Sequence, residues 1–443
     1  MTETVTDNPT TVNPSSDRLL NAQQKKAIQE ILFWTGSTRI HPIHQTLLPM
    51  PPFIVFGPAG TGKTSTVIEM IIQLIQLYPN KRILACAPSE AAADVIALRL
   101  ADKQLSTKVL HRFNWWQRLL TSVPSKLLPY CNQYQNLFEM HNIEDLLSYQ
   151  VIVTTCHATG SWLGYDKRVF FDVVIVDEAS QATEAETFLP LSFTNPGGLM
   201  VLAGDIHQLG PQTKFPFYQD CIPFASLQER LLNLPYYFHA LPQHFHNHQS
   251  HLGGSSSSSR APPSLLLHHP HQQSNSVTNM MNPLPTVIRP PPNLIPHNQQ
   301  HIQSELILGV FLNQNYRTHD RILTISSQLF YHQQLIACGE SSLVNQLSKW
   351  TYLEKHPMIP MVFYHVDGNH EHDLDSPSYY NEAEVMKVVE LCQSIAQEGL
   401  IPIREIGVIA AFRKQVLKIR QALRAVNLHA VNVGGVEDFQ GQE

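Results

Sequence analysis

The fold predicted for this chain follows from the glycine-rich segment Gly57-Pro58-Ala59-Gly60-Thr61-Gly62-Lys63-Thr64. Its small residues allow several backbone N–H groups to converge on a polyphosphate, and a helix that starts at its end adds a positive dipole. We expect the amine of Lys63 to reach the β and γ phosphates of ATP and the hydroxyl of Thr64 to hold Mg²⁺. This stretch and the following Ser65 are therefore the candidate binding residues for ATP.

The residues on both sides of this loop supply the context that the motif needs. The apolar run Phe53–Phe56 predicts a strand before it. After it, apolar side chains recur at helical spacing, which predicts a helix from Thr64 onward. A chance glycine turn before a helix is the alternative, and the strand and helix together favour the phosphate site. The apolar face of the helix consists of Val67, Met70, Ile71, Leu74 and Ile75.

Further apolar runs alternate with helical stretches along the first half of the chain. This alternation predicts a parallel sheet covered by helices, an α/β fold. We expect a first lobe over residues 18–243, with a mostly helical insertion near residues 103–150. The predicted strands are Ile83–Ala87, Val151–Thr154, Val173–Val176 and Leu199–Leu202, and a helix is predicted over Ala91–Leu100.

Two segments are expected to be disordered: residues 1–17 and the low-complexity stretch 244–304, which is rich in Ser, Pro and His. The histidines of that stretch could suggest a metal site, but a solvated loop is favoured because no rigid element fixes their spacing. A second α/β unit is expected over residues 305–443. Its predicted strands are Leu306–Leu312, Met361–Tyr364 and Ile406–Ile409, and its predicted helices are Asn381–Gln397 and Arg413–Arg424.

Composition excludes some classes of function. The net charge of −6 and the 15% of charged residues give no bulk attraction to nucleic acid, so such a role must come from local site chemistry. The six cysteines lack metal-ligand spacing. Neither a signal peptide nor a run of about 20 apolar residues is present. We therefore expect a cytoplasmic or nuclear protein with no membrane partner.

Polar residues follow two of the predicted strands. Asp177 and Glu178 come directly after Val173–Val176, and beside a phosphate loop such carboxylates hold Mg²⁺ and polarise water. We expect Asp177 to bind the metal and Glu178 to act as general base. Gln208 follows the strand Leu199–Leu202 and can sense the γ phosphate or the attacking water. The alternatives are a solvated strand end and a polar turn residue.

Five motifs in this order resemble those of the Upf-one-like superfamily 1 helicases. The closest resemblance is to the Armitage type, the Mov-ten-like RNA helicases of small-RNA silencing. The likeness extends from about Leu19 to Glu443 without the low-complexity stretch. The motifs are Gly57–Thr64, Asp177–Gln181, Gly204–Pro211, Asn315–Arg317 and Glu437–Glu443.

The resemblance implies tandem RecA-like lobes of the P-loop NTPase fold, with ATP between them and single-stranded RNA across their tops. Gln24 would contact the adenine, Tyr316 would stack on it, and Arg317 would act as an arginine finger. Glu443 would approach the ribose or the metal-bound end of ATP. The implied activity is ATP-dependent 5′-to-3′ movement on RNA with remodelling of ribonucleoprotein particles. Implied partners are Argonaute- or Piwi-type silencing proteins, in cytoplasmic granules.

The chain departs from this family at several places. Relatives carry a further motif with a second arginine after Glu443, so we expect the second lobe to be incomplete. Glu90, Ala410 and Gly435 replace residues that contact RNA in the family. The Glu90 carboxylate would repel phosphates, and Ala410 and Gly435 lack hydroxyl donors, so Glu90→Asn, Ala410→Thr and Gly435→Ser should raise RNA affinity. These departures keep open an alternative function, a truncated or degenerate paralogue that binds ATP as a non-hydrolysing scaffold. A DNA helicase of the same superfamily is a third possibility.

Overall fold

The computed structural model describes the chain in eleven ranges. They are 20–37, 50–131, 133–134, 137–138, 143–164, 169–212, 225–235, 237, 307–354, 359–372 and 377–439. The two segments expected to be disordered, 1–17 and 244–304, lie outside the described residues, as does Glu443. Residues 1–243 and 308–443 form one compact unit.

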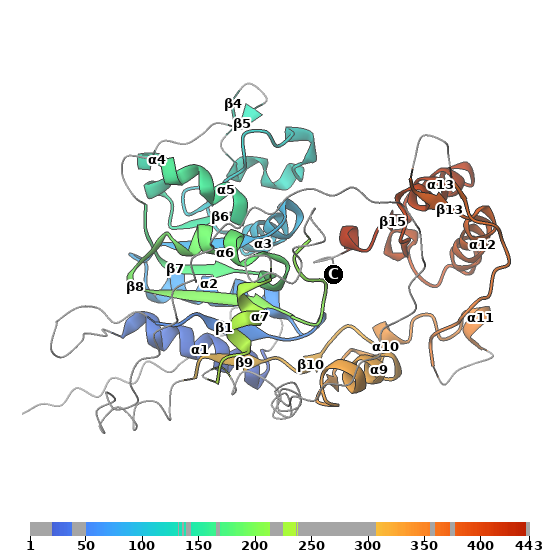
Figure 1. The fold of residues 1–443 in the computed structure, drawn as a ribbon, viewed down its shortest axis with the longest axis horizontal. Coiled ribbons are helices and arrows are strands. Elements are labelled where there is room, and N and C mark those ends of the chain that lie inside the picture. Colours follow the sequence, from blue (N-terminus) through green and yellow to red (C-terminus); the bar gives the residue numbers. More distant parts are fainter. Residues whose placement is uncertain are drawn as a thin grey trace, which may run out of the picture. The chain divides into compact units, whose positions relative to one another are not determined.

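A parallel seven-stranded sheet organises the first part of the chain (Figure 1). Its strand order is β3-β6-β2-β7-β8-β1-β9, and every neighbouring pair is parallel. Strands β1, β2 and β6 are buried throughout, as expected for a parallel sheet with both faces covered. The α/β RecA-like P-loop fold is thereby confirmed. The strands are β1 Phe53–Phe56, β2 Ile83–Ala87, β3 Leu110–Arg112, β6 Val151–Thr155, β7 Phe171–Val176, β8 Thr194–Gly204 and β9 Gly309–Phe311.

The helices of this part begin and end with recognisable signals. Helix α1 starts with a capping box, in which Asn21 and Gln24 satisfy each other's backbone N–H groups. Helix α2 buries Val67, Met70 and Leu74 completely, which confirms the apolar face predicted for it. The helices are α1 Ala22–Gly36, α2 Lys63–Leu77, α3 Glu90–Asp102, α4 Ile143–Ser148, α5 Cys156–Thr159, α6 Glu184–Leu191 and α7 Leu227–Leu232.

The insertion predicted as mostly helical, residues 103–150, is different in the structure. Strand β3 from this range joins the edge of the main sheet beside β6. The strand was missed because His111 and Arg112 give it a polar composition, although both side chains are buried. The other described elements are short: two 3₁₀ turns at Leu120–Ser122 and Ser125–Tyr130, the pair β4 Gln133–Tyr134 and β5 Leu137–Phe138, and α4.

The strand predicted to open the second unit belongs to the first sheet. Strand β9, within the predicted range Leu306–Leu312, pairs with β1, so the assignment of this strand to the second unit was wrong. The following segment stays close to the sheet, since the hydroxyl of Tyr331 donates a hydrogen bond to Asp205 after β8. This segment contains β10 Gln314–Asn315, α9 Asp320–Phe330, β11 Ile336–Ala337 and α10 Ser341–Val344.

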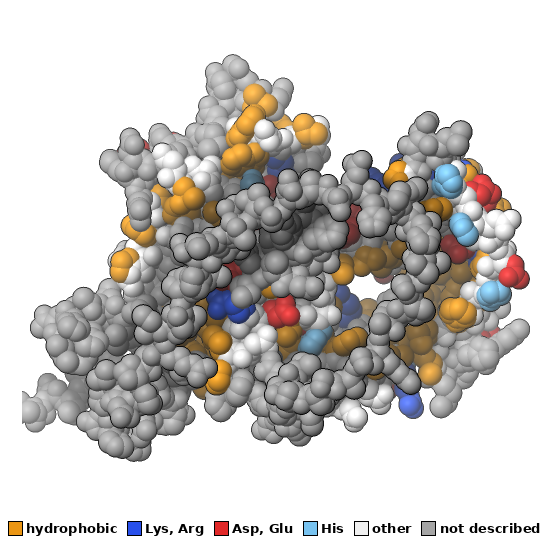
Figure 2. Space-filling model, in the orientation of Figure 1, with side chains coloured by type: hydrophobic (Ala, Val, Ile, Leu, Met, Phe, Trp, Pro, Cys, Tyr) orange, Lys and Arg blue, Asp and Glu red, His pale blue; other side chains and the backbone are white. Residues whose placement is uncertain are grey.

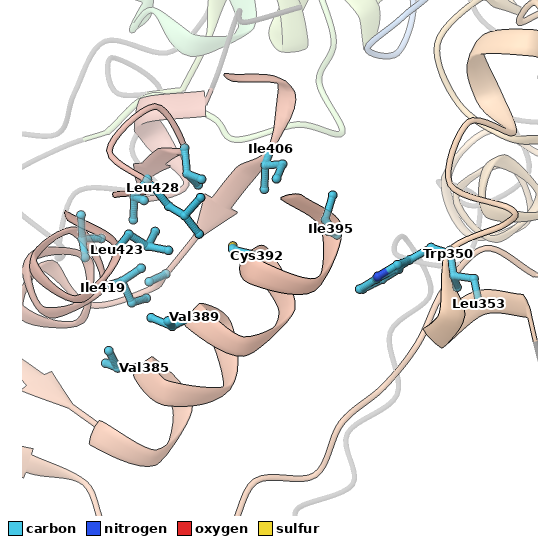
Figure 3. Close-up of a cluster of buried hydrophobic side chains, with 14 residues drawn as sticks. Trp350, Leu353, Val385, Val389, Cys392, Ile395, Ile406, Ile419, Leu423 and Leu428 are labelled. Atoms are coloured by element: carbon cyan, nitrogen blue, oxygen red, sulfur yellow. The ribbon is translucent and has the colours of Figure 1, made fainter. Parts of the chain in front are cut away.

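Residues 350–439 form a smaller part with its own apolar core (Figure 3). Val385, Val389 and Cys392 of one helix face Ile419 and Leu423 of another. The predicted strand Met361–Tyr364 is wrong, because these residues form no strand in the structure. Its elements are α11 Thr351–Glu354, β12 Glu371–His372, β13 Tyr379–Tyr380, α12 Glu382–Glu398, β14 Gly407–Ile409, α13 Arg413–Ala425 and β15 Asn432–Gly434. Within the described ranges, no helix has the length and apolar character that crossing a membrane requires.

Candidate nucleotide site

The phosphate loop has a backbone that only glycine adopts without strain. Gly60 and Gly62 have φ angles of +80° and +83°. A Cβ atom on Gly62 would lie 2.6 Å from Nε2 of Gln24, and one on Gly57 would lie 2.7 Å from the backbone oxygen of Leu312. A side chain at Gly60 or Gly62 would therefore strain the backbone, and one at Gly57 would displace its neighbours.

Lys63 and Thr61 fold back over this loop. The Lys63 amine donates a hydrogen bond to the backbone oxygen of Pro58, at 3.4 Å, and the Thr61 hydroxyl donates to the same oxygen at 2.7 Å. Lys63 is buried at the first position of α2. Its amine therefore already lies against the concave side of the loop, where a polyphosphate would bind.

Thr64 and Asp177, the two predicted metal ligands, are in direct contact. The Thr64 hydroxyl donates a hydrogen bond of 2.8 Å to Oδ2 of Asp177. Burial and the carboxylate of Glu178 raise the pKa of Asp177, while Thr64 and Lys63 lower it by less. A hydroxyl and a carboxylate are oxygen ligands that suit Mg²⁺, which would favour the ionised carboxylate. These residues fit the ion in chemical type.

Two oxygens of this kind are few for a protein metal cage. In the part of the chain that the structure describes, no group of three or more His, Cys, Asp or Glu residues is placed to hold a metal. Mg²⁺ bound with a nucleotide commonly takes its other ligands from phosphate oxygens and water. The donor set is therefore of the type that accepts the metal together with ATP.

Glu178, the predicted general base, has an unusual backbone conformation. Its φ angle of +54° is rare for a residue with a side chain, and such strain is concentrated at functional sites. Its carboxylate accepts a hydrogen bond of 3.0 Å from Nε2 of Gln181. The hydrogen bond from Gln181 therefore holds the Glu178 carboxylate in a strained turn directly after β7.

Gln208 lies where it was predicted, after β8, and is positioned by a buried acid. Its Nε2 donates a hydrogen bond of 2.9 Å to Oδ2 of Asp205. The hydroxyl of Tyr331 donates to the same oxygen at 2.7 Å, and Asp205 is fully buried. Strand β8 lies between β1 and β7 in the sheet, so Gln208, Asp177 and the phosphate loop follow neighbouring strands at one edge.

The segment around Tyr316 is hydrogen-bonded directly to the phosphate loop. Nδ2 of Asn315 donates to the backbone oxygen of Ala59 at 2.7 Å, and the Tyr316 N–H donates to that of Gly60 at 2.8 Å. Oδ1 of Asn315 accepts from the N–H of Arg317 at 3.0 Å. Tyr316 and Arg317, both exposed, are therefore attached to the loop that would bind the phosphates.

Gln24, the predicted adenine contact, is buried beside the loop. Its carboxamide oxygen accepts from the backbone N–H of Asn21 at 3.0 Å, and its Nε2 lies 3.4 Å from the backbone oxygen of Thr61. Asn21 in turn donates to the hydroxyl of Tyr316 at 2.9 Å. The two predicted adenine-binding residues, Gln24 and Tyr316, are thus linked through Asn21. Glu443 lies outside the described residues.

Glu90 differs from what its position suggested. We expected its carboxylate to repel RNA phosphates, but it is paired with two arginines. Oε2 of Glu90 accepts hydrogen bonds from Arg112 and, at 3.0 Å, from Arg118. Both arginines also bind Asp94, at 3.0 Å and 2.9 Å. The two negative charges are balanced by two positive ones, so Glu90 is part of a structural ion-pair cluster.

Sequence reasoning gave no role to three residues that organise the site: Asn315, Asp205 and Gln181. Each one lies inside a motif that was recognised, which was the available signal. The contacts of Asn315 and Asp205 could not be inferred, because Asn315 and Ala59 are 256 residues apart and Tyr331 and Asp205 are 126 apart.

Known proteins resemble this chain over nearly its whole length. Two family models, both described as an AAA domain, match residues 19–112 with 132–214 and residues 298–443. RNA helicase Mov10l1 of Mus musculus is 32% identical over 430 residues, 96% of this chain and 30% of the relative. Its Homo sapiens counterpart is 33% identical with the same coverage.

A third relative, putative helicase mov-10-B.1 of Danio rerio, is 30% identical over 98% of this chain and 38% of the relative. The chain therefore spans about a third of the length of these relatives. Together with the sheet order and the motifs placed around the phosphate loop, these matches show that the chain belongs to the Upf-one-like family of superfamily 1 helicases, and within it to the Mov-ten-like type.

Proposed function

We propose that this chain is the motor of an ATP-dependent RNA helicase. It translocates 5′-to-3′ on single-stranded RNA and remodels ribonucleoprotein particles. The observation that carries this proposal is the hydrogen bond between Thr64 and Asp177, which joins the phosphate loop to the end of β7. The helicase names of the relatives support the class of reaction.

The residues at the site supply the steps of hydrolysis. Lys63 binds the β and γ phosphates, and Glu178 accepts a proton from the attacking water. Gln208 orients that water, and Arg317 stabilises charge that develops on the transferred phosphoryl group. When bound, Mg²⁺ would neutralise phosphate charge beside Thr64 and Asp177.

The segment that follows Asn315 and Tyr316 would couple ATP hydrolysis to RNA binding. Asn315 and Tyr316 are hydrogen-bonded to the phosphate loop, and the chain continues from them toward residues 350–439. A change in the loop on hydrolysis would therefore move the start of the segment that leads to this second part.

RNA-stimulated ATP hydrolysis by the full chain tests the proposal. Lys63→Ala and Glu178→Gln should each lower the turnover at least a thousandfold, to the background rate, because one removes phosphate binding and the other the general base. The fluorescence of a labelled nucleotide separates the two, since Glu178→Gln should still bind ATP. Normal hydrolysis in either variant would contradict the assignment.

The non-hydrolysing scaffold remains the competing function. Ala410 and Gly435 lie at the ends of β14 and β15, where they offer no side-chain hydroxyl to an RNA backbone. A scaffold would bind ATP with no hydrolysis that RNA stimulates. The same assay therefore decides between the two functions.

The cellular context extends this proposal. The Mov-ten-like resemblance supports a place in small-RNA silencing, with Argonaute- or Piwi-type partners in cytoplasmic granules. Isolation of the chain from cells with crosslinked small RNAs and an Argonaute-type protein would support that place. Recovery of crosslinked DNA in their stead would favour the DNA helicase.

A further inference from the structure

Four aromatic rings gather on the surface of the part formed by residues 350–439. The ring of Tyr379 makes edge contacts with His370, His372 and Phe412, at centroid distances of 5.8, 5.6 and 5.9 Å. Tyr379 is 41% exposed and Phe412 is 51% exposed. Figure 2 shows histidine side chains at the surface of this part of the molecule. A cluster of exposed aromatic rings is typical of a surface that binds a ligand or another macromolecule.

Backbone contacts fix these rings in place. His372 pairs with Tyr379 in the antiparallel pair of β12 and β13. The hairpin is attached to α13, because Ser378 Oγ accepts a hydrogen bond of 3.0 Å from the N–H of Lys414. Nζ of Lys418 lies 4.2 Å from the ring centroid of Tyr380. The rings are therefore held before any ligand arrives, which lowers the entropic cost of binding.

The helix beside the rings is strongly basic. Helix α13 contains Arg413, Lys414, Lys418, Arg420 and Arg424 and no acidic residue, in a chain of net charge −6. Arg413 directly follows Phe412 and is exposed, and it makes no side-chain hydrogen bond or ion pair within the described ranges.

Three acidic residues of β12 and α12 have partners within the protein. Glu371 accepts a hydrogen bond of 2.8 Å from the hydroxyl of Tyr380, and Glu382 lies 3.9 Å from Lys418. Glu384 accepts from Gln415 at 3.3 Å. Of these three, only Glu382 faces a cation, because Tyr380 and Gln415 are neutral donors. The five cations of α13 outnumber these three carboxylates, so the local charge beside the rings favours an anion.

We propose that Phe412 and Tyr379, supported by His370 and His372, form a stacking surface for unpaired bases of single-stranded RNA, and that Arg413 binds the adjoining phosphate. Every base has a π face, so the surface accepts any sequence. This inference rests on the proposed function and adds to it the residues that contact RNA. It also offers a source of affinity that needs no hydroxyl at Ala410 or Gly435.

Binding of a labelled oligouridylate of about ten nucleotides by the full chain tests this surface. The measurement uses fluorescence anisotropy without nucleotide. A second oligonucleotide has the same backbone with abasic central positions. Phe412→Leu and Tyr379→Leu should weaken binding of the base-bearing strand about tenfold and leave binding of the abasic strand unchanged. Arg413→Gln should weaken binding of both strands and lower the salt slope by about 1.

Matched controls come from the same part of the chain. Phe363 is 92% exposed and makes no such ring contact with the residues that the structure describes, so Phe363→Leu should bind both strands like wild type. Arg424 lies on α13 eleven residues after Arg413, about 16 Å along the helix, and Arg424→Gln should have little effect. Equal loss on both strands for Phe412→Leu and Tyr379→Leu, or no loss at all, would overturn the stacking surface. A wild-type chain that binds no single-stranded RNA would overturn the proposed function itself.

Discussion

The polar groups around the phosphate loop and those on the surface of α13 are partnered to different degrees. Around the loop, Thr64 is bonded to Asp177, Asn315 to Ala59 and Gln208 to Asp205. On α13, Arg413 has no side-chain partner in the described ranges, and the rings of Tyr379 and Phe412 face water. The groups around the loop are held by contacts within the protein, whereas Arg413, Tyr379 and Phe412 remain available to bind a ligand.

The two ligands would therefore be bound in different ways. A phosphoryl-transfer site needs its groups fixed in advance, because catalysis depends on position. A strand that must slide needs contacts that form and break without regard to sequence, and exposed rings beside the unpartnered Arg413 would supply them. Three substitutions test the comparison, beginning with the one that should have the largest effect.

Arg317→Ala should have the largest effect, because it removes a group proposed to act only in the transition state. We expect kcat for RNA-stimulated ATP hydrolysis to fall about a thousandfold, with little change in ATP affinity. Steady-state hydrolysis and nucleotide titration measure the two quantities. Arg321→Ala is the control, since this exposed arginine lies in the same segment. An unchanged kcat would remove Arg317 from the reaction.

Asp205→Ala should show that the partnered region is held together by its buried hydrogen bonds. The substitution leaves the buried hydroxyl of Tyr331 without its acceptor, which costs about 1–3 kcal/mol in the free energy of unfolding. Denaturant unfolding measures the loss. In a Tyr331→Phe background the same change should cost clearly less, because the hydroxyl is already absent. Equal losses in both backgrounds would mean that the bond does not stabilise the fold.

Glu90→Asn should have the smallest effect, and its direction is informative. The sequence suggested that this change would improve RNA binding, whereas the structure places Glu90 in ion pairs with Arg112 and Arg118. Because Asp94 remains and Glu90 is partly exposed, we expect stability to fall by about 1 kcal/mol and RNA affinity to stay unchanged. Thermal unfolding and anisotropy measure the two. A clear gain in RNA affinity would mean that the Glu90 carboxylate does repel RNA in spite of its ion pairs.

The sequence predicted correctly those strands that consist of an uninterrupted apolar run. The strands Phe53–Phe56 and Ile83–Ala87 have the predicted bounds, because apolar runs in a parallel sheet are recognisable in isolation. The phosphate loop was equally recognisable, since its glycines are required by the backbone angles there. Within the site, the residue types could be predicted, and most of their mutual contacts could not.

The errors have physical reasons. Strand β3 was hidden by Arg112, a charge that the interior tolerates because Asp94 pairs with it. The partner of β9 was assigned wrongly, because apolar periodicity predicts a strand and is silent about its neighbour. Met361–Tyr364 has a strand-like composition, yet a strand exists only where a neighbour pairs with it, and Phe363 is almost fully exposed.

The pairing of β9 has a consequence for the long segment that precedes it. Before that segment, the hydroxyl of Tyr237 is bonded to the backbone oxygen of Pro52, and after it Leu308 accepts from the N–H of Ile54. Both anchors lie on β1 or directly before it, so the segment begins and ends at one place on the sheet. The cost of closing such a loop rises only by about 0.6 kcal/mol for each doubling of length. A change in the number of residues between Tyr237 and Leu308 should therefore cost little stability, provided that the two anchors beside β1 are kept.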